Sequence, residues 1–122
     1  MRPVSLRQWL FFFFRAEGRI SRREYGLGVL FVYLAGTALL LFVLARTAGA
    51  DSLPPVVLLL DVPLFIAVLM LAAKRCHDIN LAGTYALILM IPLAGVVWLV
   101  ALAIINGTPG PNAFGPEPNF TA

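Results

Sequence analysis

Three long stretches with almost no charge determine what this chain can fold into. Residues 26–45 and 81–105 contain no charged residue, and residues 54–73 contain only Asp61. About 20 apolar residues in an α-helix can cross the hydrocarbon core of a bilayer, which is about 30 Å thick. The chain is 61% hydrophobic and 12% charged, whereas soluble domains are typically about 25% charged. We therefore predict an all-α membrane protein with three transmembrane helices, at 26–45, 54–73 and 81–105.

A short amphipathic helix is expected before the first span, at residues 5–16. Its apolar residues recur with the spacing of one helical face, and Ser5 with Gln8 can form a capping box. The helix is too short to span, so we expect it to lie in the membrane interface with Trp9 near the headgroups. The alternative is packing against the protein's own spans. A cleavable signal peptide is disfavoured because the uncharged run starts only at Tyr25, although Ala48-Gly49-Ala50 resembles a cleavage site.

Asp61 and Pro63 interrupt the second span. An ionised carboxylate at the centre of a membrane helix costs on the order of 2.5–3.5 kcal/mol, so intramembrane acids are functional candidates. Asp61 is expected to face the helix bundle, a water-filled cleft or a positive partner such as Arg46, or to be protonated. The alternative is a shallow carboxylate solvated from the nearby loop.

The third stretch, 81–105, is long enough to span with tilt. Pro92 and Gly95 predict a kink near its middle. A re-entrant hairpin that turns at this point is the alternative, and it is disfavoured because lipid-exposed irregular backbone is not tolerated in a bilayer. The remaining residues, 106–122, are rich in Gly and Pro and predict an irregular tail. We expect residues 1–122 to form a single membrane domain.

Basic residues lie mainly on one side of the predicted helices. Six arginines precede the first span and Lys74 and Arg75 follow the second, whereas the first loop has only Arg46 and the tail has none. The positive-inside rule then places the N-terminus and the second loop in the cytoplasm. With three spans, the tail would lie on the periplasmic or extracellular side, whereas a hairpin third span would return it to the cytoplasm.

Two charged segments should therefore meet at the cytoplasmic face. The first is 17–25, in which Ser21 and Glu24 have capping-box spacing, and the second is the hinge 74–78 between spans two and three. We expect a polar network here that orients basic groups toward anionic lipid phosphates, although the arginines could serve topology alone. The candidate residues are Arg19, Arg22, Arg23, Glu24, Lys74, Arg75, His77 and Asp78.

No residue pattern predicts catalysis, a metal or a cofactor. His77 and Asp78 are the strongest catalytic pair, but the chain has one His and one Cys, while a metal site needs three or four ligands. Nucleophile-elbow, phosphate-loop and zinc motifs are absent from the sequence. The basic residues flank apolar spans, so we expect no nucleic-acid partner.

Three motifs in this order resemble the bacterial inner-membrane domain of unknown function 805 family. The matching residues are Gly18, Arg19, Arg22 or Arg23, Glu24 and Tyr25; then Lys74, Arg75, His77 and Asp78; then Gly107, Thr108, Gly110, Asn112, Phe114, Gly115 and Pro118. The family usually has a second Arg at Lys74 and Gly at Asn80. The resemblance implies a bacterial inner-membrane location and a few helices, and no established activity.

Our interpretation is a non-enzymatic structural, adaptor or anionic-lipid-interacting component of the membrane. The alternative from another class is an oligomeric channel or transporter subunit that uses Asp61. A membrane enzyme built around His77 and Asp78 is the third candidate. The expected partners are membrane lipids, with a homo-oligomer or another membrane protein left open.

Overall fold

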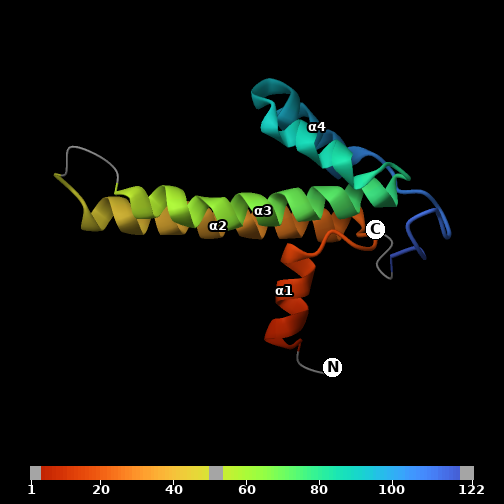
Figure 1. The fold of residues 1–122 in the computed structure, drawn as a ribbon, viewed down its shortest axis with the longest axis horizontal. Helices are drawn as coiled ribbons and strands as arrows, with labels where there is room; N and C mark the ends of the chain where they lie inside the picture. The colour runs from red at the N-terminus through yellow and green to blue at the C-terminus, as the bar shows by residue number, and fades with distance from the viewer. Residues whose placement is uncertain (1–3, 50–53, 119–122) are drawn as a thin grey trace.

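The computed structural model describes residues 4–49 and 54–118 as four α-helices and one 3-10 helix. The α-helices are α1 (Leu6–Phe14), α2 (Arg22–Arg46), α3 (Pro55–Asp78) and α4 (Pro92–Ile104), and the 3-10 helix is η1 (Gly83–Met90). Long α2 and α3 lie side by side, as Figure 1 shows, while η1 and α4 form a second hairpin at one end of this pair. The residues Asp51-Ser52-Leu53-Pro54-Pro55 predict a turn between the first two spans, and the first three of them lie outside the described residues.

Helices α2 and α3 are long and apolar enough to cross a membrane, as two of the three predicted spans require. They contain 25 and 24 residues, with mean hydropathies of 2.5 and 2.7 in their most apolar windows. Only 22% and 28% of the residues in those windows are buried, and large apolar side chains such as Leu34, Phe42 and Leu58 are exposed. An apolar helix with so much uncovered surface is matched to lipid rather than to the core of a soluble domain.

The predicted helix ends are confirmed at both N-terminal caps. Ser21 Oγ accepts from the Glu24 amide at 3.2 Å while the Glu24 carboxylate accepts from the Ser21 amide at 2.8 Å, and Ser5 with Gln8 forms the same reciprocal pair before α1. Each pair satisfies two backbone N–H groups that have no partner inside the helix. Helix α1 runs crosswise to α2 and α3 (Figure 1) and packs against α3.

The prediction that the second helix ends at residue 73 is wrong. Helix α3 continues through Lys74–Asp78, so this segment forms the last turns of a helix and not a hinge. Charged residues can extend a helix at this point because other parts of the chain neutralise and hydrogen-bond them, as described below. The helix ends at Asp78, and Asn80 follows its cap with a left-handed φ of 62°, a conformation in which helices commonly end and which Gly adopts most easily.

The prediction of a single transmembrane helix over 81–105 is also wrong. The stretch folds as η1 and α4, which turn at Ile91–Pro92 and pack against each other. Two hydrogen bonds pair part of the turn's backbone: the Ile91 amide donates to Ile88 O at 3.0 Å and the Gly95 amide to Ile91 O at 2.6 Å. This pairing, with the packing of η1 on α4, answers part of the objection to irregular backbone in an apolar environment. Close packing requires Gly95, because a Cβ there would lie 2.6 Å from Leu89 O.

The buried core lies at one end of the α2–α3 pair. Its largest fully buried side chains are Arg75, Tyr25, Leu71, Leu102 and Cys76. They come from the first turns of α2, the last turns of α3 and the end of α4. The hairpin returns the chain to this end, so the tail starts beside the first residues of α2. The tail therefore lies at the same end of the bundle as the segment before α2, whereas three spans would place the two at opposite ends.

Candidate functional site

Arg75 is the centre of a buried polar cluster at this end of the bundle. The residue is 0% exposed. Its guanidinium donates to Leu102 O at 2.8 Å and Ile20 O at 3.4 Å, and also to Ile105 O and the Asp78 carboxylate. One α3 side chain thereby joins the segment before α2 to the end of α4. An arginine supplies five donors in a fixed planar fork, which suits several acceptors at once.

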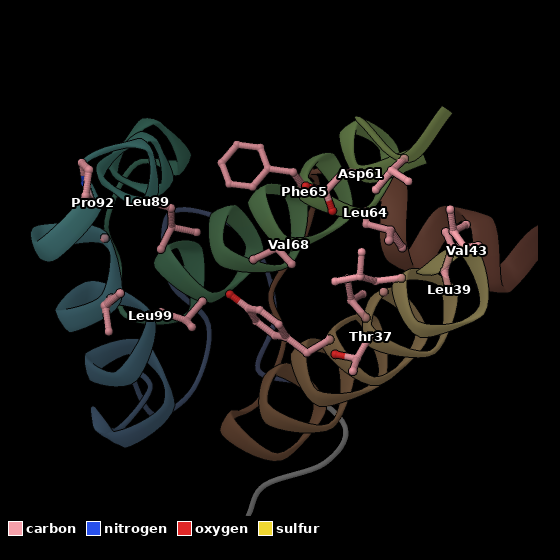
Figure 2. A pocket seen from close by; sticks show the side chains of 17 residues that line it. Thr37, Leu39, Val43, Asp61, Leu64, Phe65, Val68, Leu89, Pro92 and Leu99 are labelled. Atoms are coloured by element: carbon pink, nitrogen blue, oxygen red, sulfur yellow. The ribbon is translucent and has the colours of Figure 1, made fainter. Parts of the chain in front are cut away.

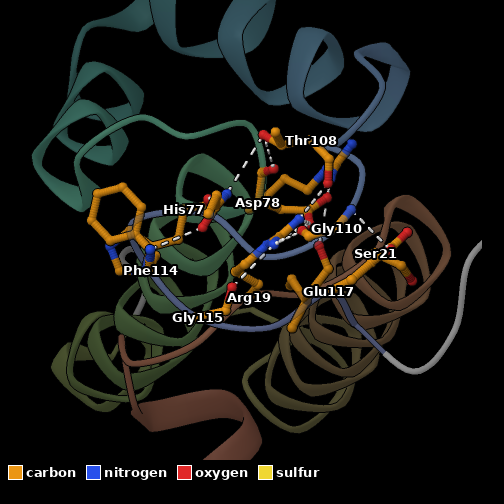
Figure 3. Close-up of polar contacts among 12 residues, drawn as sticks. Arg19, Ser21, His77, Asp78, Thr108, Gly110, Phe114, Gly115 and Glu117 are labelled. Atoms are coloured by element: carbon orange, nitrogen blue, oxygen red, sulfur yellow. Dashed lines mark hydrogen bonds and ion pairs between the residues drawn. The ribbon is translucent and has the colours of Figure 1, made fainter.

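Asp78 binds a second arginine, Arg19, from the other side. The Arg19 Nη2 and Asp78 Oδ1 atoms are 3.0 Å apart, and the two side chains are 1% and 5% exposed. Arg19 also donates to three backbone carbonyls of the tail, Thr108 O at 2.6 Å, Gly110 O at 2.6 Å and Gly115 O at 3.2 Å. Figure 3 shows Arg19 between Asp78 and these tail residues. We call Arg19, Arg75 and Asp78, with the carbonyls they hold, the clasp.

The clasp has two positive charges and one negative charge in a water-poor environment. A buried charge is tolerated only when it is paired and hydrogen-bonded. Here the carboxylate pairs with both guanidiniums, and six backbone carbonyls of the chain accept the remaining guanidinium hydrogens. The arrangement stabilises the junction of three chain segments, and its charged groups face inward.

Gly107 lets the tail lie directly on Asp78. A Cβ at Gly107 would lie 2.7 Å from Asp78 Cγ, which is far closer than carbon atoms can approach. The next residue fixes the contact, since the Thr108 amide and hydroxyl donate to Asp78 O at 2.8 and 2.9 Å. Asp78 is the last residue of α3, so its carbonyl has no partner within that helix, and these two bonds supply one.

His77 has structural partners from the other two motifs. Its ring stacks on Phe114 with centroids 4.3 Å apart and an interplanar angle of 8°. Nδ1 lies 3.0 Å from Gly18 O, and because a carbonyl only accepts, Nδ1 carries the proton in this contact. Asn112 Nδ2 donates to His77 O at 2.8 Å. Asp78 is turned into the clasp, so His77 and Asp78 do not form the pair that the catalytic hypothesis requires.

The other predicted site residues lie around the clasp with different partners. Lys74 Nζ donates to Phe12 O of α1 and lies 4.5 Å from the Phe12 ring centroid. Glu24 caps α2, and Arg22 Nη1 donates to Ile104 O at 3.3 Å. Arg23 is exposed in the first turn of α2. The predicted residues therefore lie at one end of the bundle, but Arg19 and Arg75 at the centre bind groups of the protein and not lipid phosphates.

Asp61 lies away from the clasp, in the wall of a cleft of about 450 Å³ between α2, α3 and the η1–α4 hairpin. Figure 2 shows Asp61 on α3 and Thr37 on α2 among apolar side chains such as Leu64, Val68 and Leu89. Arg46, the partner considered for Asp61, stacks instead on Phe42, with its guanidinium carbon 5.7 Å from the ring centroid.

Sequence reasoning left the tail out of the site, although Thr108, Asn112 and Phe114 hold His77 and Asp78. The available signal was the third motif, in which Gly, Asn and Phe recur in a segment too irregular for a span. Asn112 also forms a side-chain turn, because its Oδ1 accepts from the Phe114 amide at 2.9 Å.

Comparisons with known proteins agree with the family resemblance that the three motifs carry. The model of a family described as "Protein of unknown function (DUF805)" matches residues 13–116. Inner membrane protein YhaI of Escherichia coli (strain K12) is 34% identical over 106 residues, covering 85% of this chain and 86% of the relative. Inner membrane protein YhaH of the same strain is 28% identical over 108 residues, covering 85% and 87%. No solved structure matches this chain. The chain belongs to the DUF805 family.

Proposed function

We propose that this protein is a non-enzymatic structural component of the bacterial inner membrane that binds anionic lipid at its cytoplasmic face. The clasp would hold the α2–α3 and η1–α4 hairpins together at that face. The inner-membrane location rests on the names of the relatives and on the two helices of spanning length. The observation that carries the lipid proposal is the position of α1 and of the exposed arginines, all at the clasp end.

The motif residues support a structural role because their polar atoms are used within the fold. Arg19, Arg75 and Asp78 bind one another and six backbone carbonyls. A catalytic group needs a polar atom that can reach a substrate, whereas these side chains are at most 5% exposed. The three motifs are then accounted for by folding, and lipid contact is assigned to residues outside the clasp.

Helix α1 has the features of a helix that lies in the membrane interface. It runs crosswise to the candidate spans (Figure 1). Leu6, Trp9 and Leu10 are exposed, and the guanidiniums of Arg7 and Arg15 lie 5.1 and 5.3 Å from the Phe11 ring centroid. Aromatic and aliphatic side chains beside arginines fit the boundary between acyl chains and anionic headgroups.

The distribution of basic residues supports a cytoplasmic clasp end. Arg7, Arg15, Arg19, Arg22, Arg23, Lys74 and Arg75 lie at this end, and Arg46 lies at the other. The positive-inside rule favours the cytoplasm for the richer side. Since the tail is held by Arg19, we propose a cytoplasmic tail as well.

Brominated lipids, which quench tryptophan fluorescence on contact, test the position of α1. The chain has two tryptophans, so the Trp98→Phe variant reports Trp9 alone. In reconstituted bilayers, lipids brominated near the headgroup should quench Trp9 more than lipids brominated near the chain end. Stronger quenching by the deep label, or none by either, would contradict an interfacial α1.

Lipid preference is measured with the same variant by comparing brominated phosphatidylglycerol with brominated phosphatidylcholine. Each basic residue near an anionic surface contributes about 1 kcal/mol, so replacing Arg7, Arg15 and Arg23 together by Gln should remove most of the preference for phosphatidylglycerol. The matched control is Arg46→Gln, at the opposite end of the bundle. An unchanged preference in the triple variant would refute the lipid proposal.

A further inference from the structure

The cleft that contains Asp61 has the size and lining of a small-molecule site. Its volume of about 450 Å³ lies within the range of about 300–1,000 Å³ that ligand pockets show. Leu39, Val43, Leu64 and Phe65 line it from α2 and α3, and Leu89 and Val96 from the η1–α4 hairpin. The cleft exists because the two hairpins are joined at the clasp and diverge beyond it (Figure 1).

Three polar side chains line this otherwise apolar cleft: Tyr33, Thr37 and Asp61. Within residues 4–49 and 54–118, none of them has a hydrogen-bond or ion-pair partner. Asp61 is 17 residues from Asp78 along α3 and Thr37 is 16 residues from Ser21 along α2, so both lie about 25 Å from the clasp at about 1.5 Å per residue. They are thus at similar depths on the two helices (Figure 2).

An unpaired acid in such a cleft favours a positively charged ligand. An acid within a transmembrane segment normally pairs with a positive group or faces water, and Arg46 is occupied by Phe42. About 25 Å from the clasp, in a hydrocarbon core about 30 Å thick, Asp61 would lie near the far interface. A cationic headgroup at that interface could reach the carboxylate while its tail fills the apolar part of the cleft.

We propose that this cleft binds an amphiphile with an ammonium group and an aliphatic tail. The ammonium pairs with the Asp61 carboxylate, Thr37 and Tyr33 present hydroxyl oxygens to the cation, and the tail lies against Leu64, Leu89 and Val96. A second copy of the chain is the competing occupant, and it would have to bring its own positive group to Asp61. The ammonium can belong to a membrane lipid headgroup or to a free lipophilic amine.

Native mass spectrometry of the full chain in a neutral detergent tests this by counting bound molecules. The probe is dodecyltrimethylammonium, and dodecyl sulfate is the charge-reversed control. We expect one dodecyltrimethylammonium per chain and no specific dodecyl sulfate. Asp61→Asn should lower the affinity about tenfold, which corresponds to loss of about 1.4 kcal/mol of interaction, and Asp61→Glu should restore most of it. Equal binding to wild type and Asp61→Asn would overturn the proposal.

A matched pair on α4 tests the location of the tail. Val96 lines the cleft and Val97 does not, and both are exposed, at 62% and 69%, so either should accept Phe without loss of folding. Val96→Phe should lower the affinity for dodecyltrimethylammonium several-fold and Val97→Phe should leave it unchanged. Equal effects of the two substitutions would contradict a tail in the cleft.

The same spectra distinguish a lipid headgroup from a free lipophilic amine as the source of the ammonium, and both from a second copy of the chain in the cleft. Added phosphatidylethanolamine that displaces the probe supports a lipid headgroup as the natural ligand, whereas a probe that is not displaced supports a free lipophilic amine. A dimer that dissociates in Val96→Phe and excludes the probe would overturn the proposal in favour of a second copy. Lipid selectivity at α1 is measured at the other end of the bundle, so either proposal can fail alone.

Discussion

Asp78 holds Arg19, 59 residues earlier in the chain, through an ion pair of 3.0 Å between two almost fully buried side chains. This contact connects the segment before α2 to the end of α3, and the tail carbonyls that Arg19 also binds add the third segment. The fold at this end therefore depends on one carboxylate that pairs with two arginines.

Replacing Asp78 by Asn should strongly destabilise the protein. The substitution leaves Arg19 and Arg75 buried without a counter-charge, and breaking a buried pair in this way typically costs about 3–5 kcal/mol. Cys76 is the only cysteine and is buried, so a dye that fluoresces on reaction with thiols reports unfolding in detergent. We expect a markedly lower thermal midpoint for Asp78→Asn.

The matched control is Asp61→Asn, which removes an exposed acid without a protein partner within the described residues. Its midpoint should equal that of the wild type. If both substitutions shifted the midpoint equally, the clasp would not be the stabilising contact that the geometry indicates.

Gly107→Ala should release the tail from α3. The added Cβ would overlap the Asp78 carboxylate, which two arginines hold in place, so the tail must move away. We expect faster proteolysis within residues 108–118 and a higher reaction rate of Cys76 with a thiol reagent. The measurement is the rate of each reaction under native conditions.

Gly26→Ala is the control for this glycine, because a Cβ at Gly26 meets no atom within 4 Å. Alanine is favoured over glycine in a helix by about 1 kcal/mol, so this variant should be at least as protected as the wild type. A tail in Gly107→Ala that stays as protected as in Gly26→Ala would argue against the observed approach of Gly107 to Asp78.

His77 should act with Phe114 as a packing pair. Stacked rings contribute about 0.5–1.5 kcal/mol beyond the area they bury, so a double-mutant cycle of His77→Ala and Phe114→Ala should give a coupling energy in that range. The cycle is measured from thermal midpoints of the four proteins. A coupling energy near zero would remove the structural explanation of His77 and reopen the catalytic one.

The sequence predicted the first long helix and both N-terminal caps, since these depend on local chemistry. The uncharged run 26–45 lies within α2, and the Ser21–Glu24 box stands at its start. The end of α3 could not be predicted locally. The charges of Lys74 and Arg75 favour a loop when only the local sequence is considered. In the fold they are accommodated in a helix because distant segments supply carbonyl acceptors, those of Phe12, Ile20, Leu102 and Ile105.

The hairpin of η1 and α4 was the disfavoured alternative for residues 81–105, for a related reason. Length and hydropathy make 81–105 fit a spanning helix, and the objection to a turn assumes that its backbone would be unpaired. The bonds of Ile91 and Gly95 pair part of that backbone, and the tail contacts with Arg19 and Asp78 hold the returning chain. Both depend on tertiary packing and not on the periodicity of the stretch.

The side of the membrane that the tail occupies tests most directly whether the chain returns to the clasp end. In a Cys76→Ala background, Ala113→Cys reports the tail and Ala48→Cys reports the far end of α2; both positions are exposed. A membrane-impermeant maleimide applied to intact spheroplasts should label Ala48→Cys but not Ala113→Cys, and inverted membrane vesicles should show the reverse. Labelling of Ala113→Cys in intact spheroplasts, on the same side as Ala48→Cys, would contradict the account.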